Sequence, residues 1–439
     1  VSVPDKGTTI IARVKPSLKE RGNNGARRKE YFNLETCHHD IYPDAAEFKV
    51  EEGKKIRTTD CIRYEFIPPR FIKHIYHQHY YACKGTVYAG SLPAVPLLNS
   101  NYDASFIAGI LQLRYIYSMP VERIIKLFAE HGFEMNKATA HGLIKKAAGL
   151  FDLVEDVLKE TVLSDNYLSM DESYYTVLTS DTNNSSGKST AKGYIWAALA
   201  NHLKLVHFFY ENGSRSRKVL TGYLREDYRG AIQSDGLGNY KIIEKEAYPD
   251  AIRLSCFQHC KRKFLNITGN KDAEKIVRII NRLYQNEHRI PPDWTASQIL
   301  DYRNKYAPPI LKELKEELIN IKNKKSTLPK SELSKAINYT LNEYDALCNY
   351  IRSADYAPDN NAIERLMRYI SLSRRNSLFC GSHQGAKRAA LIYSLACSCR
   401  LNNINSFEYF KDLLTKLIDI NPNTDHETIR NLLPHKWQR

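Results

Sequence analysis

Three consecutive stretches decide the fold of this chain: NYLSMDESYYTVLTS at residues 166–180, KGYIWAALAN at 192–201 and LKLVHFFYEN at 203–212. Their aromatic and β-branched residues favour strands, and SSGKST at 185–190 has the small polar residues of a turn. The sequence therefore predicts three strands that follow one another directly along the chain.

Helical and extended patterns alternate after these strands. A helix is expected at 216–227, a strand at 229–236, a short helix at 241–248 and a last strand at 252–259. Three strands followed by helix, strand, helix and strand is the element order of a ribonuclease H-like α/β fold. We therefore expect a core built on one mixed sheet.

The predicted core is divided along the chain by helices. We expect its first part at residues 161–265 and its second part at 351–400, with a helical insertion at 266–350 between them. The insertion contains charged stretches such as DAEKIVRIINRLYQNEH at 272–288, in which apolar residues recur at helical spacing. A small helical appendage is expected at 401–439.

Two further regions precede the core. Residues 1–100 are predicted to be a small β-rich region, and residues 101–160 are predicted to be helical. In the helical region Gly132 ends one helix, and a second helix carries Lys137, Lys145 and Lys146, which predicts a helix-turn-helix whose second helix contacts DNA. An ordinary helical hairpin would give the same pattern.

Composition narrows the class of protein. The chain has 439 residues and a net charge of +15, which indicates a polyanionic partner such as nucleic acid. We find no apolar run of the roughly 18 residues that a membrane span needs and no signal-peptide core. The nine Cys are scattered, which favours a reducing, cytoplasmic location. Because residue 1 is Val, we expect the chain to be a piece of a longer one.

Three acids are the candidate catalytic residues and metal ligands: Asp171, Asp235 and Glu364. Phosphodiester chemistry at neutral pH needs an activated water or hydroxyl and a stabilised leaving oxygen, and two Mg²⁺ or Mn²⁺ ions held by carboxylates supply both. Asp171 lies within a predicted strand, so its neighbour Glu172 should point to the opposite face, and only one of the two is expected to be a ligand.

Each acid also has a structural interpretation. Asp235 precedes Gly236, which is a common turn sequence. Glu364 follows Asn361 at capping-box spacing and precedes Arg368 at the spacing of a helical ion pair.

Basic residues surround the three acids in the sequence. From Arg365 to Arg400 there are seven Lys or Arg and no acid, which suits a site that holds metal and phosphate together. The candidate DNA contacts of the core are Arg215, Arg217, Lys261, Arg262, Lys263, Arg365, Arg368, Arg374 and Arg375.

Seven motifs together resemble the insertion-sequence-66 family of bacterial DDE transposases. They are MDES at 170–173, GSRSR at 213–217, QSDGLGNY at 233–240, CFQHCKRKF at 256–264, DNNAIERLMR at 359–368, SRRNSLFCGS at 373–382 and LLPHKW at 432–437. The resemblance implies a ribonuclease H-like catalytic domain with a helical insertion before the Glu, and Asp171, Asp235 and Glu364 as its triad.

The resemblance also implies a coiled coil, a zinc-binding segment with paired Cys, and accessory proteins of the same element. The chain departs from the family here, because only Cys37 and Cys83 correspond to the two Cys pairs, and no coiled coil is found. These two Cys, with neighbouring His, are the candidate ligands of a zinc ion. Cys256 and His259 match another family motif and are interpreted as structural residues near the active site.

The resulting hypothesis is a transposase that cuts at transposon ends and joins the freed 3′-hydroxyl to target DNA. Its partners would be the terminal repeats, the target duplex and a second or further copy of the chain, because two ends must be joined. Two alternatives stay open: a nuclease of the same fold that cuts without joining, and a DNA-binding protein derived from a transposase.

Overall fold

The computed structural model describes residues 70–83, 86–89, 92–98, 100–179, 190–213, 215–236, 238–241 and 247–438. The chain divides into two units, Val1–Pro68 and Pro69–Arg439, and all described residues belong to the second. Cys37 and the predicted turn at 185–189 lie outside the described residues, and so does the side chain of Cys83. In the described ranges no helix is both long and apolar enough to cross a membrane.

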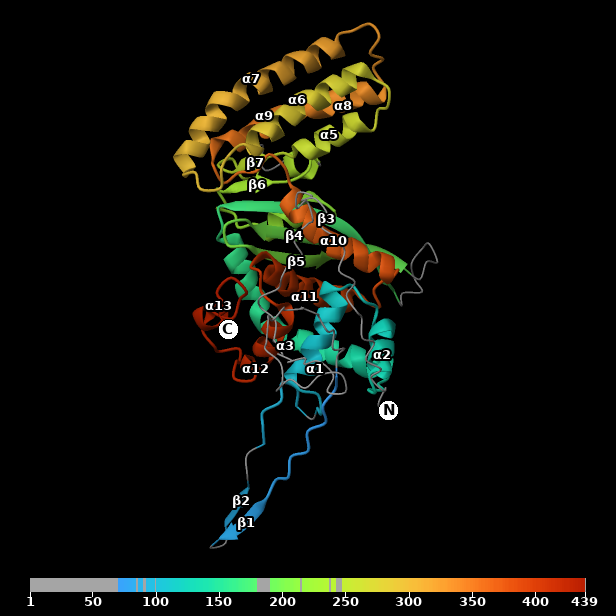
Figure 1. Ribbon diagram of the computed structural model, residues 1–439, viewed down its shortest axis with the longest axis vertical. Coiled ribbons are helices and arrows are strands. Elements are labelled where there is room, and N and C mark those ends of the chain that lie inside the picture. The colour runs from blue at the N-terminus through green and yellow to red at the C-terminus, as the bar shows by residue number, and fades with distance from the viewer. Residues whose placement is uncertain are drawn as a thin grey trace, which may run out of the picture. The chain divides into compact units, whose positions relative to one another are not determined.

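A mixed five-stranded sheet forms the centre of the second unit (Figure 1). Its strands, in the order β5-β4-β3-β6-β7, are β3 (Tyr167–Leu178), β4 (Thr190–Ala200), β5 (Leu205–Glu211), β6 (Ala231–Gln233) and β7 (Ile252–Leu254). The pairs β3–β4 and β4–β5 are antiparallel, whereas β3–β6 and β6–β7 are parallel. The five predicted strands are therefore present, in the predicted order along the chain. Two further strands, β1 (Tyr80–Cys83) and β2 (Thr86–Ala89), form a separate antiparallel pair.

Helix α11 (His383–Leu401) covers the sheet beside β5. Its residues from Ala389 to Cys399 are all buried, so the helix is apolar on nearly every side. The backbone N–H groups of Val206 and Phe208 donate to the hydroxyls of Ser398 and Ser394, at 3.0 Å and 2.7 Å. Because β5 is an edge strand, these serines satisfy backbone groups that would otherwise have no partner.

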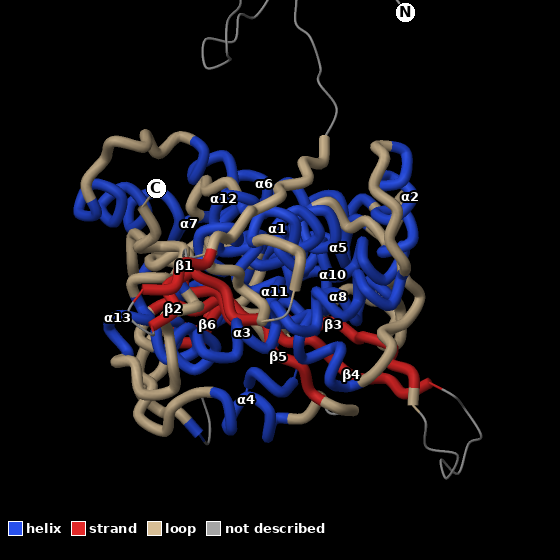
Figure 2. The backbone as a smooth tube through the Cα atoms, turned by 90° about the horizontal axis from the view of Figure 1, so that it is seen from below, coloured by secondary structure: helices blue, strands red, loops and turns tan. Residues whose placement is uncertain are grey.

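The N-terminal helices pack under the sheet with the C-terminal ones, as Figure 2 shows for α1 and α12. Helix α1 (Ala104–Leu111) continues as a π-helix (Gln112–Ile116). The next helices are α2 (Val121–Glu130) and α3 (Lys137–Leu163), followed near the C-terminus by α12 (Ser406–Lys416) and α13 (His426–Arg430). Gly132, with φ +80°, lies directly after α2, so the expected helix stop is present.

A second hydrophobic core lies in the block of helices between β7 and the acid-bearing helix α10 (Asn361–Asn376). The block consists of α5 (Phe257–Leu265), α6 (Lys271–His288), α7 (Ala296–Lys322), α8 (Glu332–Asn342) and α9 (Tyr344–Cys348). The predicted helical content of 266–350 is therefore present. The second core also takes in Phe257, Cys260 and Phe264, because α5 packs its apolar side into this block.

A buried ion pair joins this helical block to the sheet. Arg253 of β7 donates to Glu343, between α8 and α9, at 2.5 Å, and the two side chains are 3% and 1% exposed. Lys241 lies 2.9 Å from the other carboxylate oxygen of Glu343. Beside the pair, Ser255 N donates to Ala346 O at 3.1 Å. The block is therefore fixed at the end of the sheet where the candidate acids lie.

Candidate functional site

Asp171 lies in β3, and Asp235 lies two residues beyond the end of β6, the parallel neighbour of β3. Ser169 of β3 pairs with Gln233 of β6, and each aspartate follows its paired residue by two positions. The negative charge of Asp235 raises the pKa of Asp171, which indicates that the two carboxylates lie close together. The two acids are thereby brought together, as the sequence analysis required.

Glu364 lies in the first turn of α10, whose start is attached to β3. The side chain of Asn360, the N-cap residue, donates to the carbonyl of Met170 at 2.9 Å, directly before Asp171. The carboxylate of Glu364 lies 3.5 Å from His259 Nδ1 and 3.6 Å from Arg262 Nη2. These contacts place the third acid at the same end of the sheet.

The two structural interpretations of Glu364 are not supported. The N-cap of α10 is Asn360 rather than Asn361, and it makes no side-chain capping bond. The charged partners that lie within 4 Å of Glu364 in the described ranges are His259 and Arg262, both from α5, and not Arg368.

The electrostatics of Asp171 reflect the surrounding acids. Burial raises the pKa of Asp171 well above its usual value, and the negative charges of Glu172, Asp235 and Glu364 raise it further. Carboxylates that repel one another in a partly buried place are stabilised by a cation between them. The donor set of three carboxylates fits Mg²⁺ or Mn²⁺, which prefer oxygen ligands.

Glu172 is held by partners of its own, although the charge of Asp235 also raises its pKa. Its carboxylate accepts from Arg215 Nε and Nη2 at 2.8 Å and 2.6 Å, and from the Tyr240 hydroxyl at 2.7 Å. Burial raises the pKa of Glu172, and these hydrogen bonds oppose the rise. Glu172 is therefore a buried structural acid, and the guanidinium of Arg215, a predicted DNA contact, is bound to it.

A tyrosine from the helical block fixes the turn after Asp235. Gly236 N donates to the Tyr339 hydroxyl at 3.1 Å, and a Cβ at position 236 would lie 2.5 Å from that oxygen. A side chain at position 236 would have to displace the tip of the Tyr339 side chain, so the constraint on Gly236 comes from this close approach and not from a positive φ. Nothing in the local sequence indicates this role of Tyr339.

The basic residues of α5 and α10 lie beside the acids. Arg262 and Lys263 are exposed on α5, where the Lys263 ammonium lies 4.3 Å above the Tyr339 ring. Arg365 and Arg368 are exposed along α10. The remaining predicted contacts are the partly exposed Lys261 on α5, the exposed Arg375 and the partly exposed Arg374 at the end of α10, and the exposed Arg217 on α4 (Arg217–Tyr223).

Arg374 is the most fixed of these cations. Its Nη1 donates to the carbonyl of Tyr174 at 2.9 Å, and its guanidinium carbon lies 4.0 Å from the centroid of the Tyr174 ring. At the far end of α10 this cation–π contact therefore holds the helix against β3.

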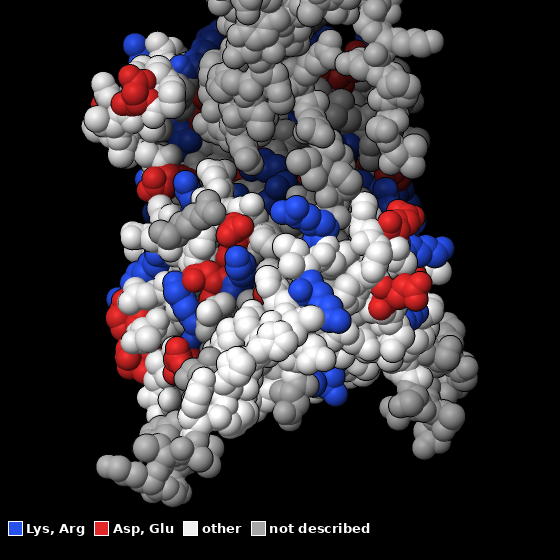
Figure 3. All heavy atoms as spheres, turned by 60° about the horizontal axis from the view of Figure 1, so that its bottom comes forward, with Lys and Arg blue, Asp and Glu red and all other residues white. Residues whose placement is uncertain are grey.

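The predicted contacts on α3 lie elsewhere in the same unit. Lys145 and Lys146 are exposed, whereas Lys137 forms an ion pair with Glu122 of α2. On the face in Figure 3, Lys and Arg are interspersed with Asp and Glu rather than gathered in one patch. The excess positive charge is therefore not concentrated on the visible part of that face.

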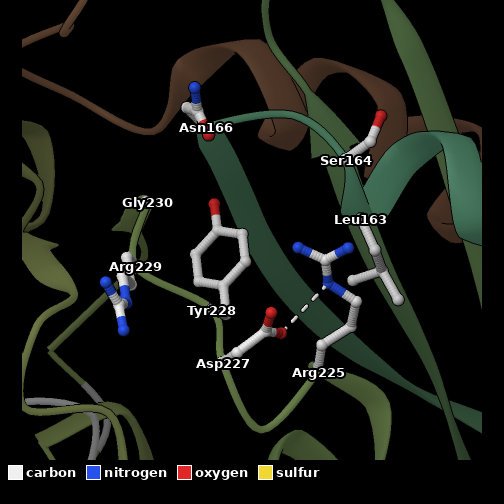
Figure 4. A pocket seen from close by; sticks show the side chains of 8 residues that line it. All are labelled: Leu163, Ser164, Asn166, Arg225, Asp227, Tyr228, Arg229 and Gly230. Atoms are coloured by element: carbon white, nitrogen blue, oxygen red, sulfur yellow. Dashed lines mark ion pairs between the residues drawn. The ribbon is translucent and has the colours of Figure 1, made fainter.

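A cavity of about 330 Å³ lies at the other end of the same strands (Figure 4). It is lined by Leu163, Ser164, Asn166, Arg225, Asp227, Tyr228, Arg229 and Gly230, and Arg225 Nε lies 3.4 Å from Asp227. Asn166 and Gly230 directly precede β3 and β6, whereas the candidate acids lie further along or beyond these strands. None of the predicted site residues lines this cavity.

An acidic group at the end of a mixed sheet, with basic helices beside it, defines a class of α/β proteins suited to chemistry on phosphodiesters. The comparison with known families identifies the protein family within that class. Residues 99–388 match the Transposase IS66 family, so the chain belongs to this family of transposases.

Similar proteins occur in Sinorhizobium fredii (strain NBRC 101917 / NGR234). The chain is 26% identical to the uncharacterized protein y4jD, over 81% of this chain and 70% of that protein. It is 24% identical to the uncharacterized protein y4hP, over 76% of this chain and 62% of that protein. A third similar protein, y4qI, is 24% identical over 84% of this chain and 69% of its own length.

Proposed function

We propose that this chain is a DDE transposase that cuts DNA at transposon ends and transfers the freed 3′-hydroxyl to target DNA. The observation that supports the proposal is that the charges of Asp235 and Glu364 both raise the pKa of the buried Asp171, so the three acids lie in one neighbourhood. Their carboxylate oxygens do not all lie within 4.8 Å of one another, so metal binding would draw them to a common centre. The sheet order β5-β4-β3-β6-β7, with three antiparallel strands followed by two parallel ones, supports a ribonuclease H-like fold.

The three carboxylates are proposed to hold two Mg²⁺ or Mn²⁺ ions. When bound, such a pair activates the attacking oxygen and stabilises the leaving one. The protein positions the carboxylates beforehand: Asn360 fixes the start of α10 to β3, and Tyr339 fixes the turn after Asp235. Arg262, Arg365 and Arg368 would hold phosphate oxygens near the acids, and the 3.6 Å contact of Arg262 with Glu364 supports this role.

Other parts of the chain are proposed to bind and position DNA. Helices α2 and α3 would act as a helix-turn-helix, with Lys145 and Lys146 facing the terminal repeat and Lys137 exchanging Glu122 for a phosphate. Two or more copies of the chain would act together, with accessory proteins encoded by the same transposable element. A zinc ion at Cys37 and Cys83, and a cytoplasmic location, stay predictions.

Strand transfer tests this proposal. Donor duplexes carrying the terminal repeats of the encoding element are incubated with the protein, target DNA and Mg²⁺. We expect joined products from the parent and a loss of at least about 100-fold in the Glu364→Ala protein, which corresponds to about 2.7 kcal/mol of transition-state stabilisation. The matched control is Glu316→Ala, because Glu316 is an exposed acid of α7.

The products separate the alternatives. Cleavage without joining would indicate a nuclease, and tight DNA binding without Mg²⁺-dependent cleavage would indicate a DNA-binding protein. Full activity of Glu364→Ala would contradict the assignment of the triad.

A further inference from the structure

A second group of metal-ligating side chains lies where α5 and α10 begin. Cys256 directly precedes α5, His259 lies in its first turn, and Glu364 lies in the first turn of α10. One ligand atom from each of the three residues lies within 4.8 Å of the other two. In the sequence Cys256 and His259 supply only two neighbouring ligands, and only the fold brings the third ligand, Glu364, to them.

Backbone contacts hold the two helix starts together. Phe257 N donates to the carbonyl of Pro358 at 3.0 Å, and Asn360 N donates to Cys256 Sγ at 3.3 Å. Both segments are therefore fixed by the tertiary structure itself. Burial raises the pKa of the Cys256 thiol to about 12, so a bound metal would have to displace the thiol proton.

Two buried atoms of this group have no hydrogen-bond partner among the described residues. His259 Nδ1 and Glu364 Oε1 lie 3.5 Å apart without forming a hydrogen bond. Buried polar atoms almost always have a partner. Two ligand atoms that are each 2.0–2.1 Å from a tetrahedral zinc ion lie about 3.4 Å apart, so the observed spacing suits a shared ion.

We propose that Cys256, His259 and Glu364 form a binding site for Zn²⁺. Sulfur and imidazole nitrogen favour zinc over magnesium, which prefers oxygen ligands. Three protein ligands leave a fourth position for water. Binding requires modest movement, because the three ligand atoms must approach from their present spread to a common centre.

The site shares Glu364 with the proposed carboxylate triad. Zinc at Cys256 and His259 would therefore compete with the magnesium pair for Glu364 and inhibit strand transfer. This inhibition rests on the proposed function, whereas zinc binding itself does not.

Cobalt spectroscopy tests the site without DNA or magnesium. Co²⁺ replaces Zn²⁺ in such sites and shows a charge-transfer band when a thiolate is a ligand. Cys37, Cys61 and Cys83 are first changed to Ser, since cysteines of the N-terminal region could also bind cobalt. We expect the band in this background protein, its loss in Cys256→Ser, and at least about tenfold weaker Co²⁺ binding in His259→Ala and Glu364→Gln.

The chain offers a matched control for the cysteine. Cys260 is also buried, lies one turn further along α5, and does not belong to the group, so Cys260→Ser should keep the band. Asp171→Asn should also keep it, and this separates the zinc site from the triad. Absence of the band in the background protein, or a band unchanged by Cys256→Ser, would overturn the proposal. Thermal melting without metal identifies a variant that has lost the band only because it unfolds.

Discussion

At the scale of single residues, the same chemical group serves different purposes according to its neighbours. Asp171 and Glu172 are adjacent acids on β3, but the charges of Asp235 and Glu364 raise the pKa of Asp171, whereas Arg215 and Tyr240 bind Glu172. The alternation of side chains predicts that only one of the two can be a metal ligand. It does not predict the partners of Glu172, because Tyr240 is far from it in the sequence.

His202 provides a pH-dependent contact at the start of the sheet. Its Nδ1 lies 2.6 Å from the buried carboxylate of Asp165, and its Nε2 lies 3.4 Å from Asp355. Partial burial lowers the pKa of His202, but the two carboxylates outweigh burial and the net shift is upward. The resulting stabilisation is complete below the unfolded pKa of about 6.5 and is lost as the pH rises through the folded value.

We therefore expect His202→Gln to lower the urea midpoint more at pH 5.5 than at pH 8. Urea unfolding of parent and variant at both pH values measures the difference. Since His202 is 44% exposed, solvent screening keeps the effect small. An equal loss at both pH values would show that the charge of His202 does not matter.

At the scale of elements, the sequence predicts the strands better than the connections between them. The positions of the five strands along the chain follow from the aromatic and β-branched stretches, whereas their order in the sheet does not. Gly132 correctly predicts where α2 ends. The pattern gives no sign that α1 continues as a π-helix, because side-chain spacing alone does not distinguish the two helix types. It also places the end of the core at residue 265, although Phe257 and Phe264 pack into the helical block.

The serines of α11 allow a prediction about the edge of the sheet. Replacement of Ser394 by Ala leaves the buried N–H of Phe208 without its 2.7 Å partner, so we expect a loss of about 1–3 kcal/mol in unfolding free energy. Faster hydrogen exchange at the Phe208 amide should accompany the loss. Ser371→Ala is the control, because Ser371 bonds only within α10 and is more exposed. Equal exchange at Phe208 in both variants would contradict this role.

At the scale of the whole molecule, the grouping of the three acids is a prediction from the resemblance and does not follow from the residues alone. Asp235 and Glu364 are separated in the sequence by the whole helical block, and only the fold places the start of α5 beside Glu364. For the same reason the contacts of Glu364 with His259 and Arg262 could not be foreseen.

DNA binding should depend on salt through the exposed cations of α10. We expect Arg365→Ala and Arg368→Ala each to weaken binding to duplexes of unrelated sequence about equally, and each to reduce the slope of log K against log salt by about one. Fluorescence anisotropy at several salt concentrations measures the slope. Arg282→Ala, on α6, is the control, because Arg282 is paired with Glu313 within the helical block. A slope unchanged by both α10 substitutions would show that this helix does not contact phosphates.

The two edges of the sheet have a consequence for how copies of the chain can assemble. Serines of α11 bind the outer backbone groups of β5, and on the other side Asn349 donates to the carbonyl of Arg253 in β7 at 2.9 Å. A neighbouring copy therefore cannot add its own strand at these positions without displacing native partners. If two copies meet around paired DNA ends, β-augmentation at these edges is disfavoured, and their contacts should come from helical surfaces or through the DNA itself.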